Sequence, residues 1–425
     1  MGSGADVITD TLETIHDALV RNRSGEVASY IPKLAQADPE EFAIALASVG
    51  GHSYQSGDVD ATFTLQSASK PFVYALALTE LGWSGVSPWL RTEPSGERFD
   101  GISLEPGTGR PMNPMINAGA MVATALIPGA GPEEKFAKIL NTLSRFAGRP
   151  LEVDEEVFAS EVATGDRNRA LGYLMHAAGA LPGEVNETAD LYFRQCSVKA
   201  TVGDVALMAA TLAGGGTNPV TGEQVVPPRV ATKVLAVMAT CGMYNASGDW
   251  LVRVGLPAKS GVSGIVLAAS PGRSGIAAFS PNLDSTGNTV RGIAALRMIS
   301  ERFRLHLMHN PATAGFPVTV VSEPGAEVGV VSAEGVLDFS VVERLISAFG
   351  EALPDPPGAL VCDLSEIDEA DQLAIQLVGA SLKRLYGEGY RIAVIGNVLE
   401  EQEWPSFVTR EAAVGWVVSE LEAGA

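Results

Sequence analysis

A break in the hydrophobic pattern at residues 310–317 constrains the fold of this chain more than any other feature. Helix-period segments fill the sequence before the break, whereas the break itself consists of small residues and prolines (NPATAGFP), as interdomain linkers do. Upstream, many helical segments and few strands predict an α+β domain with a small antiparallel sheet and a helical subdomain. Downstream, strands and helices alternate, which predicts a small α/β domain of about 100 residues. We therefore expect two domains, over residues 1–312 and 317–425.

The apolar periodicity also predicts the individual elements. In the first domain we expect helices over residues 7–21, 72–81, 132–146, 155–179 (in pieces), 202–213, 228–240 and 291–299, and strands over residues 42–48, 265–269 and 274–279. In the second domain we expect strands over residues 318–322, 328–332, 359–364 and 391–395, and helices over residues 340–353, 370–386 and 410–422. No internal repeat is visible in the sequence.

Charge and composition exclude several classes of partner. The 425 residues carry a net charge of −21 and give a pI of about 4.6, which argues against nucleic acid or an anionic membrane as a partner. The N-terminal residues lack the basic region and apolar core of a secretory signal, and no window reaches the roughly 18 apolar residues of a membrane span. Three widely spaced cysteines predict buried small side chains, not a disulfide framework or a zinc site. We expect a cytoplasmic protein without a metal.

Ser67 and Lys70 stand three residues apart where the helical pattern of residues 72–81 begins. Such residues share a helical face, so a lysine that burial keeps partly neutral can accept the serine proton. A serine N–H at a helix N-terminus can also bind an oxyanion. Because Pro71 disfavours helical geometry at the preceding residue, we expect an irregular first turn. Alone, the pair is more often an N-cap serine followed by a solvated lysine.

A second motif, Lys-Ser-Gly at residues 259–261, precedes the strand expected at residues 265–269. Serine hydrolases of the penicillin-recognising type carry Ser-x-x-Lys early and Lys-Ser/Thr-Gly late, on a strand that flanks the active site and supplies a second oxyanion N–H. Their middle element, Ser-x-Asn or Tyr-x-Asn, is missing here, because the only Ser-x-Asn lies at residues 280–282, after the Lys-Ser-Gly motif. A penicillin-recognising hydrolase is therefore the alternative enzyme.

Longer motifs are similar to the serine-dependent glutaminases. They follow that family's order from about residue 10 to about residue 305, and they comprise YIPKLA (30–35), LQSASK (65–70), NPMINAGA (113–120), LYF (191–193), CGMY (241–244), GLPAKSGV (255–262) and FSPNLD (279–284). This resemblance implies a β-lactamase-like fold. It also implies that the chain hydrolyses L-glutamine to L-glutamate and ammonia without a cofactor.

The same resemblance implies roles for individual residues. Ser67 would be the nucleophile and Lys70 its base, with Tyr30 and Tyr244 close to this pair and Tyr244 relaying a proton to the leaving amine. The N–H groups of Ser67 and Val262 would form the oxyanion hole. The substrate contacts would come from Asn117, Glu161, Asn168, Tyr192, Tyr244 and Val262.

These residue types suit glutamine physically. A carboxylate such as Glu161 can pair with the substrate ammonium, while Asn and Tyr side chains can bind the substrate carboxylate and fix its length. Taken singly, each residue has another interpretation: Asn117 as a turn, Glu161 as a solvated helix residue, and Tyr30 or Tyr192 as a core aromatic. Their position within the motifs favours the site.

One departure from the family pattern lies beside the expected oxyanion hole. The family usually reads Ser-Gly-Val-x-Gly-Gly-Ile, whereas residues 260–265 read SGVSGI, one glycine shorter. A shortened loop can displace the Val262 N–H, and a shift of about 1 Å there can cost about a hundredfold in rate. A non-catalytic glutamine sensor is therefore a further alternative to the enzyme.

Residues 317–425 resemble a STAS domain, the fold of anti-sigma-factor antagonists, in the segments LVCDLS (360–365) and DEADQ (368–372). Phosphorylatable members carry a serine after the aspartate that opens the helix, whereas this chain has Gln372. We expect a binding, regulatory or oligomeric role with a protein partner, the alternative being a structural appendage. The whole protein is expected to form a homodimer or homotetramer.

Overall fold

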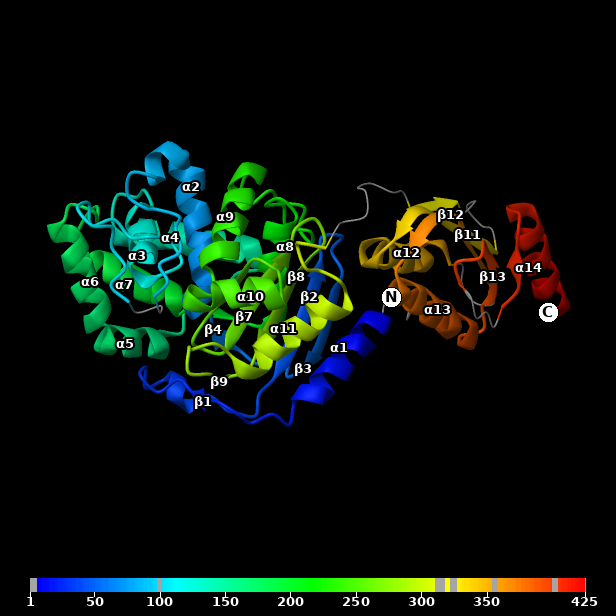
Figure 1. The fold of residues 1–425 in the computed structure, drawn as a ribbon, viewed down its shortest axis with the longest axis horizontal. Helices are drawn as coiled ribbons and strands as arrows, with labels where there is room; N and C mark the ends of the chain where they lie inside the picture. The colour runs from blue at the N-terminus through cyan, green and yellow to red at the C-terminus, as the bar shows by residue number, and fades with distance from the viewer. Residues whose placement is uncertain are drawn as a thin grey trace. The chain divides into compact units, whose positions relative to one another are not determined.

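The computed structural model describes residues 6–97, 101–309, 318–321, 327–353, 358–399 and 404–424 (Figure 1). These residues form two compact units. One contains residues 12–301 and 305–308, and the other contains the described residues among 6–11, 302–304 and 309–424. The linker predicted at residues 310–317 lies outside the described residues, so the domain boundaries at 312 and 317 stay predictions.

A five-stranded antiparallel sheet with the order β3-β2-β8-β7-β6 forms the centre of the first unit. Its strands are β2 (Ala43–Ser48), β3 (Ser53–Gly57), β6 (Ala258–Ser260), β7 (Ile265–Ser270) and β8 (Ser274–Phe279). In the register, Ala45 of β2 lies between Gln55 and Ala277. Strands β2, β7 and β8 are buried along their whole length, which explains why their sequences are continuous apolar runs and do not alternate.

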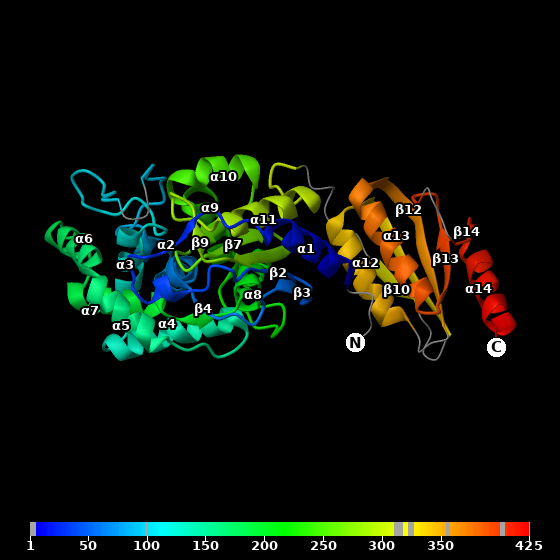
Figure 2. The ribbon, with the colours of Figure 1, turned by 90° about the horizontal axis from the view of Figure 1, so that it is seen from below.

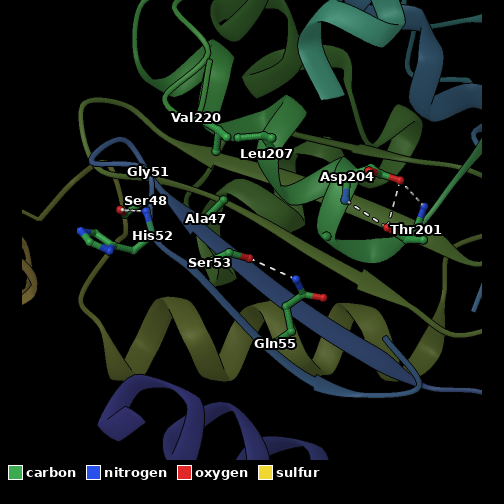
Figure 3. Close-up of a pocket in the computed structure, with 11 residues that line it drawn as sticks. Ala47, Ser48, Gly51, His52, Ser53, Gln55, Thr201, Asp204, Leu207 and Val220 are labelled. Atoms are coloured by element: carbon green, nitrogen blue, oxygen red, sulfur yellow. Dashed lines mark hydrogen bonds between the residues drawn. The ribbon is translucent and has the colours of Figure 1, made fainter. Parts of the chain in front are cut away.

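Helices cover both faces of this sheet. Helix α8 (Val202–Ala213) packs so closely on β8 that a Cβ at Gly275 would collide with the Ala210 backbone. Helix α11 (Val290–Arg302) packs on the other face, where Gly292 lies against Val266 of β7. Figure 3 shows both helices, with the sheet between them and with Asp204 and Leu207 labelled on α8.

The helical part of the first unit lies at one end of the sheet (Figures 1 and 2). Its central helix α2 contacts α3, α4 and α9. Its members are α2 (Lys70–Val86), α3 (Asn117–Ala125), α4 (Pro132–Ala147), α5 (Glu155–Thr164), α6 (Asp166–Ala177), α7 (Val185–Cys196) and α9 (Pro228–Cys241). The unit is completed by helix α10 (Ser247–Arg253) and the short strands β1 (Glu26–Val27), β4 (Phe63–Thr64), β5 (Lys199–Ala200) and β9 (Asn282–Leu283). Helix α1 (Asp6–Leu19) is divided, because its residues from Leu12 onward belong to this unit and the earlier ones to the second unit. Helices α3, α7 and α10 and strands β3 and β6 were not predicted from the sequence.

The second unit contains a five-stranded sheet in the order β10-β11-β12-β13-β14. Strand β10 (Val318–Val321) is antiparallel to β11 (Val328–Leu337), and β11, β12 (Ala359–Ala370), β13 (Arg391–Ile395) and β14 (Ser406–Phe407) are parallel neighbours. The helices are α12 (Phe339–Ala352), α13 (Gln372–Gly387) and α14 (Arg410–Gly424). The predicted alternation of strands and helices is confirmed, although β11 and β12 extend beyond their expected ends. Helix α13 begins two residues later than expected, because the Asp371 side chain accepts a hydrogen bond from the Leu373 N–H and so caps the helix.

Candidate active site

Ser67 lies in a short 3₁₀ turn, η3 (Gln66–Ser69), that leads directly into α2. Its neighbour Gln66 adopts a left-handed backbone with φ of 50°, which side chains other than glycine rarely accept. Pro71 occupies the first turn of α2, where its missing N–H costs no helical hydrogen bond. The turn before α2 is irregular, but Lys70 itself has regular helical angles, φ −55° and ψ −46°, so the departure expected at the residue before Pro71 is not found. The turn places Ser67 directly before a helix whose first half, Lys70–Leu78, is buried.

Lys70 contacts the Ser67 hydroxyl in the interior of the unit. Its Nζ lies 2.9 Å from Ser67 Oγ and 2.7 Å from Asn117 Oδ1, with the Tyr244 hydroxyl at 3.4 Å. The lysine side chain is almost completely buried. Burial lowers the Lys70 pKa to about 7, although the negative charge of Glu161 opposes the shift. Close to neutral pH, a large fraction of Lys70 is therefore uncharged and able to accept a proton.

A second buried lysine, Lys259 of β6, lies on the other side of Tyr244. Its Nζ donates to the Tyr244 hydroxyl at 2.9 Å and to the Ser260 carbonyl at 2.6 Å. Burial, reinforced by the charge of Lys70, lowers the pKa of Lys259 well below its usual value. Tyr244 is held in a left-handed conformation with φ of 56° and also hydrogen-bonds Ser67, so its hydroxyl connects Ser67 to both lysines.

A cavity of about 400 Å³ opens beside Ser67. Helices α3, α5, α6 and α7 each contribute one of the predicted substrate contacts. The cavity is lined by Tyr30, Ile31, Gln66, Ser67, Asn117, Glu161, Thr164, Gly165, Arg167, Asn168, Tyr192, Cys196 and Val262. Tyr30 is 51% exposed and thus belongs to its accessible side. Tyr244, predicted to contact substrate, is not among the lining residues and reaches the site through Lys70 and Ser67.

Hydrogen bonds connect the polar side chains of this cavity. Asn117 donates to Asn168 Oδ1 at 3.0 Å and accepts from the Tyr192 hydroxyl at 3.2 Å. Glu161 accepts a hydrogen bond from Gln66, but burial raises the Glu161 pKa to about 7. A cationic group entering the cavity would favour the ionised carboxylate. Within the described ranges, no three metal-binding side chains gather as a metal site, and no helix has the length and apolar character to cross a membrane.

Val262 lies in the hairpin turn between β6 and β7. We call the 3₁₀ turn of Ser67, the expected nucleophile, the nucleophile turn. Gly261 approaches this turn so closely that a Cβ there would lie 2.8 Å from the Leu65 carbonyl oxygen. The shortened loop closes with regular hydrogen bonds, from Gly261 N to Ile265 O at 2.8 Å and from Gly264 N to Gly261 O at 3.0 Å. Gly264 takes the left-handed backbone, φ 103°, that the tight turn requires. The turn therefore accommodates the missing glycine and keeps Val262 on the cavity wall.

A sequence model of the family Glutaminase matches residues 25–308, two thirds of the chain. The chain belongs to the glutaminase family. Glutaminases are amidohydrolases, so the predicted enzyme class is confirmed, and the penicillin-recognising alternative is not needed.

Relatives and solved structures agree with this family assignment. A glutaminase of Corynebacterium glutamicum is 40% identical over 390 residues, which cover 91% of this chain and 94% of that protein. A glutaminase of Microcystis aeruginosa is 46% identical over 298 residues, which cover 70% of this chain and 88% of that protein. The solved structure of Mglu superposes with a TM-score of 0.71 and 41% identity, covering 95% of this chain and 100% of that one. The predicted mixed α and β fold of the glutaminases is therefore confirmed.

The glutaminase cavity also contains residues that the sequence interpretation did not select. Gln66 lies next to Ser67 in the motif LQSASK, and this position was the only indication in the sequence that it belongs to the site. Thr164 and Arg167 flank the recognised Glu161 and Asn168 in sequence and line the cavity with them. Cys196 was interpreted as a buried small residue, and its thiol pKa, raised to about 12 by burial, keeps it protonated although it lines the cavity. Lys259 was recognised in its motif but received no role.

Proposed function

We propose that this chain hydrolyses L-glutamine to L-glutamate and ammonia through an acyl-enzyme on Ser67. The observation that carries the proposal is the 2.9 Å contact between Ser67 Oγ and the buried Lys70, at the wall of a cavity that also contains Glu161. A serine becomes a nucleophile when a base within hydrogen-bond reach takes its proton. Lys70 meets both requirements, since it is in contact and its pKa is lowered to about 7.

The first half-reaction follows from this geometry. Neutral Lys70 accepts the Ser67 proton while Oγ attacks the γ-carbonyl carbon of glutamine. The resulting oxyanion binds to the backbone N–H groups of Ser67 and Val262, two residues that line the same cavity. Tyr244, in contact with both Lys70 and Ser67, passes a proton to the leaving amine, and ammonia departs. Water then attacks the acyl-enzyme by the reverse proton route and releases glutamate.

Substrate selection uses the other polar side chains of the cavity. The Glu161 carboxylate pairs with the α-ammonium group of glutamine, because an opposite charge offsets the burial that otherwise neutralises Glu161. Asn117, Asn168 and Tyr192 form one hydrogen-bonded group that binds the α-carboxylate, with Tyr30 at the open side. The fixed separation between Glu161 and Ser67 selects the length of glutamine over that of asparagine.

The second unit supports a STAS-like interpretation in its order of elements and in the Asp371 cap of α13, where Gln372 takes the position of a phosphorylatable serine. We propose that this unit has a binding or oligomeric role and that the protein forms a homodimer or homotetramer in the cytoplasm. Sedimentation of the full chain over a range of micromolar concentrations tests the assembly. A monomer throughout that range would contradict it.

Ammonia release from L-glutamine, compared between the wild type and Ser67→Ala, tests the catalytic proposal, with L-asparagine and a chromogenic β-lactam as comparison substrates. We expect glutamine turnover that is lost in Ser67→Ala. Arg297→Gln, an exposed charge on α11, serves as a control that keeps activity. If the wild type binds glutamine without releasing ammonia, the protein is a glutamine sensor. Equal turnover in wild type and Ser67→Ala would exclude Ser67 as the nucleophile.

A further inference from the structure

A row of buried polar side chains lies behind the nucleophile, outside the substrate cavity. The Thr124 hydroxyl lies 2.9 Å from both Gln195 Oε1 and the Ala120 carbonyl oxygen, which share its one proton, and Gln195 Nε2 donates to Ser69 Oγ at 3.2 Å. The Ser69 hydroxyl donates in turn to the backbone carbonyl of Gln66 at 2.7 Å. Thr124, Gln195 and Ser69 have no exposed surface. A glutamine in such a place is unusual, since apolar side chains of similar size would fill the space without needing partners.

The direction of these hydrogen bonds follows from the chemistry of a hydroxyl group. A serine has one proton to donate and lone pairs to accept. Because Gln195 Nε2 donates to Ser69 Oγ, the Ser69 proton is directed to the Gln66 carbonyl. Gln195 is itself oriented by Thr124 on the opposite side. The row therefore ends in one hydrogen bond to one backbone carbonyl.

That carbonyl belongs to the same planar peptide unit as the Ser67 N–H. In a trans peptide the C=O and the N–H point in opposite directions, so a group that fixes the carbonyl also fixes the N–H. The chain enters this peptide through Gln66, whose left-handed φ of 50° is unfavourable for a residue with a Cβ. The orientation of the peptide itself is set by ψ of Gln66 and φ of Ser67. Released from Ser69, the peptide could rotate about these two bonds and turn the Ser67 N–H away.

We propose that Ser69 and Gln195 are positioning residues that aim the Ser67 N–H at the oxyanion. This inference rests on the proposed acyl-enzyme reaction, in which that N–H is an oxyanion donor. Thr124 lies on α3, the helix that begins with Asn117, and Gln195 lies on α7, which carries Tyr192. The row thus connects the nucleophile turn to the helices that form the substrate cavity.

The test compares Ser69→Ala with Ser300→Ala. Ser300 is also buried and also donates from Oγ to a backbone carbonyl, that of Val254 at 2.6 Å, but on α11. Crystal structures of both variants and their kcat and KM for L-glutamine are measured. In Ser69→Ala we expect the Gln66–Ser67 peptide to rotate, seen as a change in ψ of Gln66 and φ of Ser67, and kcat to fall by about tenfold to a hundredfold. We expect KM to stay within about twofold and the midpoint of the pH profile to stay unchanged, because Lys70 and the cavity are not altered. Ser300→Ala should retain both kcat and KM.

Gln195→Met is the second variant, for the case that Ser69→Ala does not fold. It keeps the shape of the side chain and the Ser69 hydroxyl but removes the group that orients it, so kcat should fall less than in Ser69→Ala while KM again stays constant.

The structural and kinetic measurements separate the two proposals. If the wild type does not hydrolyse glutamine, the proposed function fails, while the Gln66 conformation in the variants still decides whether Ser69 fixes the peptide. A Gln66–Ser67 peptide that keeps its wild-type orientation in Ser69→Ala, together with a wild-type kcat, would overturn the positioning role alone. So would a fall in kcat matched by a similar rise in KM, since a general loss of structure changes both.

Discussion

Two buried lysines contact the same tyrosine hydroxyl, and each makes the other harder to protonate. Lys70 and Lys259 approach Tyr244 from different elements, α2 and β6, at 3.4 and 2.9 Å. Both have lowered pKa values because burial disfavours their charged forms, and the charge of Lys70 lowers the Lys259 pKa further. Lys259, whose pKa the charge of Lys70 lowers further, therefore stays neutral while Lys70 titrates. The neutral Lys70 amine becomes available next to Ser67 as the pH rises through about 7.

The titration of Lys70 predicts how activity depends on pH. Since the Lys70 pKa is lowered to about 7, protonation below that pH removes the base that accepts the Ser67 proton. Glu161, whose pKa is raised to about 7, also takes up a proton in this range. We expect kcat/KM for L-glutamine to fall by about tenfold to a hundredfold per pH unit well below pH 7, as one or both groups are required, and to level off above it. Thermal melting over the same pH range serves as the control for unfolding. A profile that stays flat from pH 5.5 to 8 would contradict the role of Lys70.

Lys259→Met tests the second lysine. The substitution keeps an unbranched apolar stem in a buried position and removes the hydrogen bond to the Tyr244 hydroxyl. We expect kcat to fall by about tenfold to a hundredfold, because Tyr244 loses the contact that orients it for proton transfer. KM should change little, since Lys259 is not among the residues that line the cavity. Lys233→Met, on the exposed side of α9, is the matched control, and an unchanged kcat in Lys259→Met would contradict the prediction.

At the scale of single residues, the sequence motifs identified most of the site but not its internal connections. Ser67, Lys70, Asn117 and Glu161 come together as the resemblance implied. Their assigned roles stay predictions. The contact between Lys259 and Tyr244 joins residues fifteen positions apart on different elements, and the row through Gln195 joins three separate segments. No local pattern reports such contacts, because they depend on how the elements pack.

At the scale of elements, strong local signals gave accurate boundaries. Helix α8 was predicted over its observed range, 202–213, although it is almost entirely buried. It begins at a capping box in which Thr201 and Asp204 bond each other's backbone N–H groups (Figure 3). Helix α3 was missed because its sequence, NAGAMVATA, is almost uniformly small and buried and has no polar face. Strand β6 has only three residues, and β3 is a short polar edge strand, so neither gives a clear alternation.

The close approach of β6 and the nucleophile turn predicts the effect of Gly261→Ala. The added Cβ would lie 2.8 Å from the Leu65 carbonyl and 2.9 Å from Ile265 Cγ2, so the hairpin must move away from Ser67. We expect kcat to fall by about a hundredfold, because the two oxyanion donors would separate. Gly248→Ala on α10 is the control, since a Cβ there meets no atom within 4 Å and alanine favours a helix. Equal kcat values for the two variants would show that the turn tolerates displacement.

At the scale of the whole molecule, the high negative charge predicts a response to salt. Fifty acidic and 29 basic side chains give the net charge of −21, and the many ion pairs of the first unit involve partly exposed groups. Unpaired like charges repel one another more in the compact state, and salt screens this repulsion over about 10 Å at 0.1 M. Raising NaCl from 0.05 to 0.5 M at pH 7.5 should therefore raise the melting temperature by about 2 °C or more.

The same salt titration close to the pI of about 4.6, where the net repulsion vanishes, is the internal control. There the increase should be smaller or reversed, because screening then acts mainly on attractive ion pairs. An equal increase at both pH values would show that salt acts through hydration of apolar surface and not through charge.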